Sequence, residues 1–326
     1  AGDLFVGQQN VEEGYDPISA LGTGTLVVQG MTLPTAWTET GNKLFPLLST
    51  SSDIIIANQV QLNTTLGIGS TSESVIFTGK ISGTGGLYLN DPYYNSSTIL
   101  SNDANDFSGG VYLEGYASLY VETNHSLGTG RLAFGNSSGD VYFDSTAPVV
   151  YGLETTSDED YPSLYVTQPN TVLTVNQSFD SNFQGDFYSE AVPDNFRIVK
   201  TGSGTLNLAA VGFYPLNGTV EATLPGSPQV MVQVNSGKLV FTDVWFSSNA
   251  PTIWVHGGML AFDHFNSTYS NPVVVDNSGR LSGVGGSFGS VTVSSTGILS
   301  PGVAGPSDVG ALHFSNMTLM AGGVLE

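Results

Sequence analysis

A short phrase, Gly-x-Leu with a second apolar residue two positions later, recurs along this chain and constrains its fold more than any other feature. It begins at Gly24, Gly85, Gly130, Gly204, Gly237, Gly258, Gly279, Gly297, Gly310 and Gly323. Glycine permits the positive φ of a tight turn, and the two apolar residues then face the same side of a strand. Several copies are spaced by roughly 20 residues, which suits two or three short strands with their turns. The phrase predicts one rung of a β-solenoid.

The intervals between these phrases predict strands and no helices. Runs of β-branched or aromatic residues, such as 24–28, 111–113, 230–234 and 290–293, are bounded by Gly, Asn, Asp, Ser or Pro. No apolar stripe of helical period persists for three turns, and glycine interrupts every candidate. The fold class is therefore all-β. A large β-sandwich is the alternative, although a sandwich does not repeat one phrase at its strand starts.

Stacked rungs should place like residues on one another inside the solenoid. The expected interior residues are Leu87, Leu89, Leu132, Phe134, Leu206, Leu208, Leu239, Phe241, Leu260 and Phe262. Leu239 should lie on Leu260 and Phe241 on Phe262, with Leu312 and Phe314 as a further copy. Asn235 and Asn277, beside the turns, are expected to form ladders of amide hydrogen bonds.

Charge and cysteine content exclude several classes of protein. The chain has 7 Lys and Arg against 28 Asp and Glu, a net charge of −21, and no cysteine. Too few cations are present to neutralise phosphates, so neither nucleic acid nor an anionic membrane surface is expected as a partner. Disulfides, zinc–thiolate sites and thiol catalysis are excluded. No apolar run reaches the ~18 residues of a membrane-spanning helix, so no membrane-spanning segment is expected.

One part of the sequence resembles a known family. Residues 75–143 contain V-I-F-T-G-K-I-S-G-T-G-G-L-Y-L, L-S-N-D-A-N-D-F-S-G-G-V-Y-L-E and N-H-S-L-G-T-G-R-L-A-F in that order. A second copy begins at 199–208, and a third spans 279–293 and continues to Gly302. This order resembles the autotransporter-associated β-strand repeat, also called the passenger-associated transport repeat. The resemblance implies a right-handed parallel β-helix exported to a bacterial cell surface, in a family whose repeat carries no catalytic residues.

The repeat also divides the chain. Residues 1–60 fit it poorly and are expected to form an irregular N-terminal cap or docking segment. Residues 61–326 are expected to form the solenoid, with a loop-rich insertion at 144–196, where the phrase is missing. The start, Ala-Gly-Asp, lacks a signal sequence and suggests a mature exported chain. The end at Glu326 falls within a phrase, so a longer native chain is expected.

Metal and catalytic motifs are weak. The histidines His125, His256, His264 and His313 lie far apart, which gives little support for zinc. The acidic residues Glu154, Asp158, Glu159 and Asp160 are a weak calcium site and are expected in a solvated loop. Residues 285–289 match G-x-S-x-G, but no helix pattern follows to form a nucleophile elbow. We expect no catalytic residues and no cofactor, with Ca²⁺ as the weak exception.

Two further sets of residues are candidates for surface roles. Asn-x-Ser/Thr sequons, which are possible glycosylation sites, occur at Asn63, Asn95, Asn124, Asn136, Asn176, Asn217, Asn266 and Asn316. The aromatic contact candidates are Trp37, Tyr93, Tyr94 and Trp245, because Tyr and Trp anchor protein contacts and stack on sugars.

These observations predict a non-enzymatic extracellular protein, a β-solenoid stalk, adhesin or subunit of a bacterial surface fibre or layer. Self-association or other surface proteins and glycans are the expected partners, and head-to-tail association would follow from open sheet edges. A pectinase-like carbohydrate-active enzyme and a glycan-binding adhesin module are the alternatives. Outward carboxylates on consecutive rungs would favour the enzyme, and stacked outward aromatic residues would favour the glycan-binding module.

Overall fold

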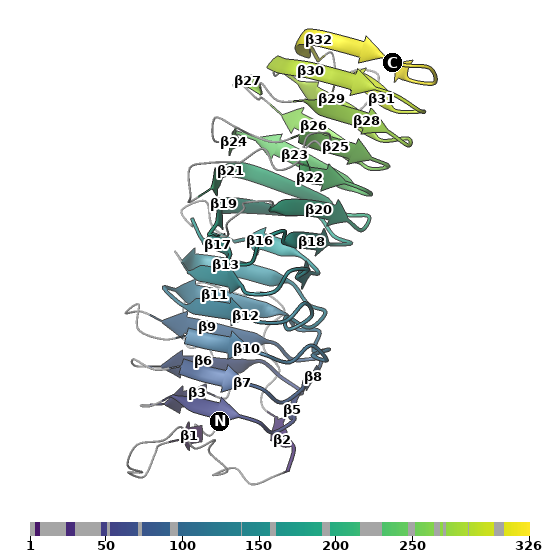
Figure 1. The fold of residues 1–326 in the computed structure, drawn as a ribbon. Helices are drawn as coiled ribbons and strands as arrows, with labels where there is room; N and C mark the ends of the chain where they lie inside the picture. Colours follow the sequence, from purple (N-terminus) through teal and green to yellow (C-terminus); the bar gives the residue numbers. More distant parts are fainter. Residues whose placement is uncertain are drawn as a thin grey trace. The chain divides into compact units, whose positions relative to one another are not determined.

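The fold was examined in a computed structural model of the 326-residue chain. It describes residues 4–6, 24–29, 47–50, 53–70, 74–91, 97–137, 139–156, 161–190, 196–215, 230–246, 252–263, 268–269, 272–285, 287–302 and 310–326. Every regular element in these residues is a β-strand (Figure 1). The predicted all-β class is confirmed.

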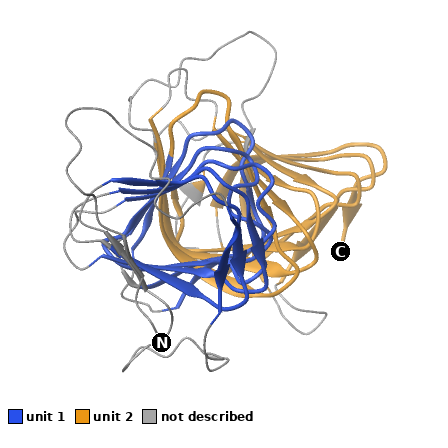
Figure 2. Ribbon diagram, turned by 90° about the horizontal axis from the view of Figure 1, so that it is seen from below, with its two compact units in different colours: residues 1–165 blue, residues 166–326 orange. Residues whose placement is uncertain are grey.

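The chain divides into two compact units, residues 1–165 and 166–326 (Figure 2). In each unit short strands pair in parallel with strands about 20 residues away in sequence, so that each rung stacks on the one before it. Each unit is therefore a parallel β-solenoid. The β-sandwich alternative is wrong.

Unit 1 is built from three rows of strands. Row 1 comprises β1 (Leu4–Val6), β3 (Leu47–Thr50), β6 (Leu66–Ser70), β9 (Leu87–Asp91), β11 (Val111–Gly115), β13 (Leu132–Ser137) and β16 (Leu153–Thr155). Row 2 comprises β4 (Ile54–Ile56), β7 (Ser74–Phe77), β10 (Ser97–Leu100), β12 (Ser118–Val121) and β14 (Asp140–Phe143). Row 3 comprises β2 (Leu26–Val28), β5 (Val60–Leu62) and β8 (Ile81–Gly83). β15 (Val149–Val150) follows β14, and β17 (Ser163–Val166) crosses the boundary between the units.

Unit 2 has two rows. Row 4 comprises β18 (Val172–Asn176), β20 (Arg197–Thr201), β22 (Val230–Val234), β25 (Thr252–His256), β28 (Val273–Asp276) and β30 (Ser287–Val293), which also pairs with β27 (Thr268–Tyr269) and β32 (His313–Leu319). Row 5 comprises β19 (Ser181–Ser189), β21 (Thr205–Pro215), β23 (Lys238–Thr242), β26 (Met259–Asp263), β29 (Arg280–Val284), β31 (Ile298–Pro301) and β33 (Val324–Leu325). β24 (Trp245–Phe246) pairs with β21 beside this row.

The repeated leucine forms a continuous column in row 5. Leu206, Leu239, Leu260, Leu281, Leu299 and Leu325 lie in register on successive strands. Two residues further along each strand, Leu208 lies opposite Phe241, and Phe241 opposite Phe262. All ten residues predicted for the interior are buried. The predicted superposition of Leu239 on Leu260 and of Phe241 on Phe262 is confirmed.

The predicted further copy, Leu312 with Phe314, is wrong. Leu312 lies outside any strand, and Phe314 belongs to β32, where it faces Phe288 of row 4. The phrases at Gly310 and Gly323 lie within a single rung, one before β32 and the other before β33. Their closer spacing in the sequence therefore reflects two sides of one turn of the solenoid.

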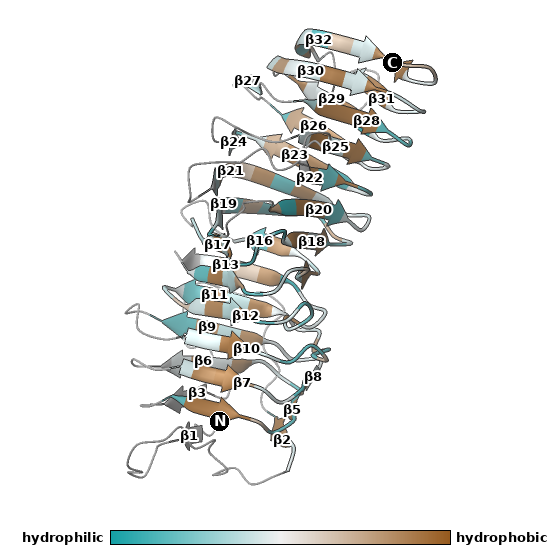
Figure 3. Cartoon of the chain, in the orientation of Figure 1, coloured by the Kyte–Doolittle hydropathy of each residue, from teal (hydrophilic) through white to brown (hydrophobic). Residues whose placement is uncertain are grey.

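Buried and partly exposed residues alternate along several strands, among them β7, β10, β12, β14 and β17. The strands carry both hydrophobic and hydrophilic segments (Figure 3). In β12, Leu119 and Val121 are buried while Ser118 and Tyr120 are partly exposed. Strands of a solenoid have one face toward the interior and one toward the surface, which explains the alternation. The outward residues are where functional groups have to be sought.

The predicted segments at 1–60 and 144–196 contain paired strands in their described parts. β1 to β4 lie within 1–60 and pair in parallel with later strands or with each other. β18 and β19 lie within 144–196 and pair with β20 and β21. The role of either segment as a cap or insertion stays a prediction.

Candidate functional site

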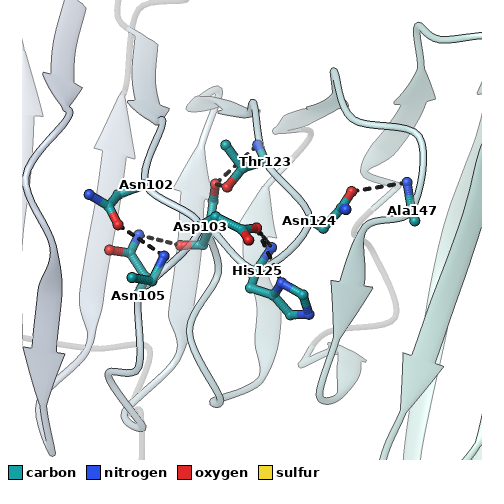
Figure 4. Close-up of polar contacts among 9 residues, drawn as sticks. Asn102, Asp103, Asn105, Thr123, Asn124, His125 and Ala147 are labelled. Carbon is teal, nitrogen blue, oxygen red and sulfur yellow. Dashed lines mark hydrogen bonds and ion pairs between the residues drawn. The ribbon is translucent and has the colours of Figure 1, made fainter.

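The corners of the rungs in unit 1 are held by side chains that bond the backbone of neighbouring rungs (Figure 4). Asn105 accepts a hydrogen bond from the Ile81 N–H (2.8 Å) and donates to the Ser126 carbonyl (2.8 Å), so it ties three rungs together. Asn102 donates to the Thr78 carbonyl (2.8 Å). Turn backbone groups lack ladder partners, and these amides satisfy them. These asparagine hydrogen bonds are therefore explained by the stability of the turns, without a role in binding.

The hydrogen bonds shown for Asn235 and Asn277 do not form the predicted amide ladder. Asn277 donates from Nδ2 toward Nε2 of His256 on the preceding rung (3.2 Å). Asn235, which follows β22, accepts from Gln233 of that strand (2.7 Å). The amide ties described above are instead in unit 1, where asparagines follow the ends of row 2 strands.

Two histidines pair with aspartates on adjacent rungs. His125 Nδ1 lies 3.1 Å from Asp103, and its backbone N–H and ring hold the pKa of that carboxyl below its usual value. His256 Nδ1 lies 2.7 Å from Asp276 Oδ1, which also accepts from Trp254 Nε1 (3.0 Å). His313 is exposed on β32, and His264 lies outside the described residues. Nowhere in the described residues do three His, Cys, Asp or Glu gather as a metal site would require.

Of the four calcium candidates, the structure describes Glu154. Glu154 lies on strand β16 and not in the expected loop, because β16 pairs with β13. Its Oε2 lies 2.6 Å from the Arg131 guanidinium, so this carboxylate is engaged in an ion pair. Asp158, Glu159 and Asp160 lie outside the described residues, so calcium binding stays a hypothesis.

Several outward carboxylates lie opposite residues that are not acids. Asp186 lies opposite Gly212, Asp263 opposite Val284, and Asp276 opposite His256. One pair comes closer to the geometry of a sugar-cleaving enzyme: Glu122 and Asp144 occupy the same position, just after the paired strands β12 and β14. Glu122 accepts a hydrogen bond from the Ser101 hydroxyl on the preceding rung.

The G-x-S-x-G match has no nucleophile elbow. Ser287 begins β30, which pairs in parallel with β32, and Phe288 is buried beside it. A nucleophile elbow requires a sharp strand-to-helix turn. Residues 287–289 belong to strand β30 and not to a glycine-rich turn of the solenoid.

Tyrosines form a ladder on the outer face of row 2. Tyr120 and Tyr142 stack with ring centroids 4.6 Å apart and planes 10° apart, and Tyr142 stacks on Tyr165 at 4.7 Å and 9°. Each ring therefore covers the face of its neighbour. A sugar stacks on an open ring face, but both faces of the middle ring, Tyr142, are taken up by its neighbours, and the ladder stabilises the sheet surface.

Of the predicted contact candidates, Trp245 on β24 is 52% exposed. Trp37, Tyr93 and Tyr94 lie outside the described residues. Trp245 therefore lies on the surface of unit 2, near Tyr188 and Tyr214 on strands β19 and β21. The sequence analysis did not select these two tyrosines as contact candidates.

The sequons differ in accessibility. Asn63, Asn176 and Asn316 are exposed, whereas Asn124 is partly buried and accepts the Ala147 N–H (3.0 Å). Asn136 lies on β13, and Asn95, Asn217 and Asn266 lie outside the described residues. Glycosylation stays a hypothesis.

Sequence reasoning missed a buried lysine. Lys200 occupies an interior position of row 4, in register with Val175 and Val234, and it is fully buried. Its Nζ donates to the Thr201 carbonyl (2.6 Å) and lies 3.4 Å from that of Gly202. Burial, opposed by the charge of Asp180, lowers the pKa of Lys200 from 10.5 to about 8. The burial of Lys200 could have been predicted from strand alternation, because residues two apart face the same side and Ile198 is apolar.

Lys200 predicts a pH-dependent stability. Its pKa in the folded chain lies below that of the unfolded chain, so the unfolded chain binds more protons between pH 8 and 10.5. The cost of burying the charge is fully present below pH 8 and is relieved as pH rises. The urea midpoint of unit 2 should therefore rise from pH 7.5 to 10, and Lys200→Met should remove that rise. Lys238→Met is the control. If both variants lose the rise of the urea midpoint with pH equally, the rise does not come from Lys200.

The described residues contain no helix that could span a membrane. Comparison of the chain with protein-family models, curated proteins and solved structures finds no match. The fold and its side-chain columns define the class: this is a β-helix repeat protein.

Proposed function

We propose that the chain is a non-enzymatic, extracellular structural or adhesive protein: a β-solenoid stalk, or a subunit of a bacterial surface fibre or layer. The observation that carries this proposal is the apolar filling of the rungs, in which the column from Leu206 to Leu299 is buried throughout. Fully burying a leucine contributes about 1.5–3 kcal/mol, so each rung stabilises the next. A unit packed in this way holds its own two ends at a fixed separation, which supports a role in a stalk or fibre.

The finer assignment is to the autotransporter-associated β-strand repeat. It is supported by the order of the motifs in residues 75–143 and their partial copies near 199–208 and 279–302. That assignment carries the proposed bacterial cell-surface location. Protease treatment of intact producing cells tests it: surface exposure predicts cleavage without lysis, and protection until lysis would contradict it.

Head-to-tail association is the proposed mode of assembly. Leu325 continues the column of Leu299, but it is 55% exposed where Leu299 is 3% exposed, and Val324 beside it is 41% exposed. In the 326-residue chain this apolar strand edge is a template for parallel strand addition, and we propose that a second copy of the same 326 residues adds there, whereas further rungs of a longer chain would cover it. The 326-residue chain should form concentration-dependent oligomers in light scattering and rods or filaments in electron micrographs. Leu325→Asp should abolish them, whereas a monodisperse monomer at all concentrations would contradict the proposal.

The enzyme alternative has a direct test at Glu122 and Asp144. Sugar cleavage commonly uses two carboxylates a few ångströms apart. We expect the chain to release no reducing ends from pectin or from neutral plant and bacterial polysaccharides. Release that disappears in the double variant Glu122→Gln/Asp144→Asn, but persists in Asp186→Asn, would overturn the non-enzymatic assignment.

A further inference from the structure

The outer face of β19, β21 and β24 in unit 2 combines acids with aromatic rings. Along β19, Phe187 and Ser189 are buried, so the alternate residues Asp186, Tyr188 and Glu190 lie toward the surface. An acid thus precedes and follows the tyrosine on one strand face.

Two neighbouring strands extend this face with exposed rings. Tyr188 stacks on Tyr214 of β21 with centroids 5.2 Å apart and planes 20° apart. Trp245 of β24 lies in register with Gly212. A Cβ on Gly212 would lie 2.2 Å from Cε2 of Tyr214, so the missing side chain lets the Tyr214 ring lie over the backbone opposite Trp245. Tyr214 is 39% and Trp245 52% exposed.

The carboxylate of Asp186 is held in place beside these rings. Its Oδ1 accepts the Gly212 N–H (3.0 Å) and its Oδ2 accepts the Tyr188 hydroxyl (3.1 Å). A further exposed acid, Asp243, precedes Trp245 by two residues. The charge on this face is therefore negative and fixed in position.

The cations described in unit 2 are mostly engaged elsewhere. Arg197 bonds Gln233, Lys200 bonds turn carbonyls, and Arg280 pairs with Glu326 (2.7 Å). The whole chain carries a net charge of −21. The field around this face therefore attracts a cationic partner.

We propose that this face, formed by Asp186, Tyr188, Glu190, Tyr214 and Trp245, binds a basic, arginine-containing segment of a partner protein. A guanidinium stacks on Trp and Tyr rings and donates to carboxylates in the same plane, so one arginine uses both features of the surface. A neutral sugar can also stack on the rings and donate hydroxyl hydrogen bonds to the carboxylates, but it gains nothing from the negative charge of the chain. This inference goes beyond the structural role and does not depend on it.

The test is isothermal titration calorimetry of the full chain with a synthetic peptide of alternating arginine and glycine. Saturable binding is expected, weaker at 300 mM than at 50 mM salt, as for any exposed charge pairing. The same peptide with citrulline in place of arginine keeps the shape without the charge, and it should bind at least roughly tenfold more weakly.

Variants separate this surface from general attraction to an acidic protein. Trp245→Ala should weaken binding roughly tenfold, whereas Tyr161→Ala, at an equally exposed aromatic residue of unit 1 (52%), should not change it. Asp186→Asn should weaken binding more than Glu122→Gln, which removes the same charge elsewhere. Equal effects within either pair would overturn the proposal. Binding of uncharged cellohexaose or chitohexaose, lost in Trp245→Ala, with no binding of the arginine peptide would overturn it as well and identify a glycan surface.

Discussion

Leu239→Asp is expected to unfold the rungs around β23 and to destabilise unit 2 by about 4 kcal/mol or more. Leu239 is fully buried in the leucine column between Leu206 and Leu260. The substitution removes its apolar contacts and places a carboxylate where row 5 supplies only apolar neighbours. Urea unfolding followed by circular dichroism measures the loss, and the fluorescence of Trp254 on β25 reports on the same unit.

Leu325→Asp is the matched control for this prediction. It is the same substitution in the same column, at a residue that is 55% exposed, so its carboxylate stays hydrated. At protein concentrations where the chain is monomeric, we expect the free energy of unfolding to change by no more than about 0.5 kcal/mol, as for ordinary surface substitutions. Similar losses in the two variants would show that the column does not stabilise unit 2 in the way described.

Gly83→Ala is expected to destabilise unit 1 by about 3 kcal/mol, through backbone strain and collision together. Gly83 ends β8 with φ +107°, a conformation that side chains disfavour. It lies in register with Leu62 on β5, and a Cβ there would come within 2.2 Å of the Leu62 carbonyl oxygen. The positive φ and the contact with the Leu62 carbonyl oxygen both belong to the backbone. Neither rotation of a side chain nor a small shift therefore relieves them.

Gly24→Ala tests whether this loss is specific to the contact between rungs. A Cβ at Gly24 would meet no atom within 4 Å, and the residue is exposed. The substitution should be neutral or slightly stabilising, because it lowers the entropy of the unfolded chain. A loss at Gly24 comparable to that at Gly83 would contradict the steric explanation.

The interior could be predicted from the sequence because its signal is local. A turn glycine, a leucine and a second apolar residue two positions later determine which side chains face inward, and Leu239 and Phe241 lie where this rule places them. The rule does not determine to which row of strands a given Gly-x-Leu phrase belongs. For that reason Gly310 was read as a further copy, although β32 belongs to row 4 and β33 to row 5.

The surface could be predicted less well, because its groups depend on register between rungs. Trp245 was singled out from its residue type, but its neighbours Tyr214 and Asp186 are brought to it by the pairing of β21 with both β19 and β24. Lys200 illustrates the opposite problem. Charge suggests an exposed side chain, whereas the strand period and the adjacent turn carbonyls hold it inside.

Because the leucine column repeats once per rung, unit 2 can be shortened or lengthened by one whole rung at a time. Removal of residues 258–278 would excise β26, β27 and β28 and join Gly257 to Gly279 within a glycine-rich turn. Leu239 would then meet Leu281, and Val255 would meet Val293, so these two positions keep equivalent neighbours, whereas Phe241 would meet Gly283 in place of Phe262. Tandem duplication of the same segment would lengthen the body by the same logic. Unequal recombination between such repeats is therefore a direct genetic route to shorter or longer forms of this protein that still fold.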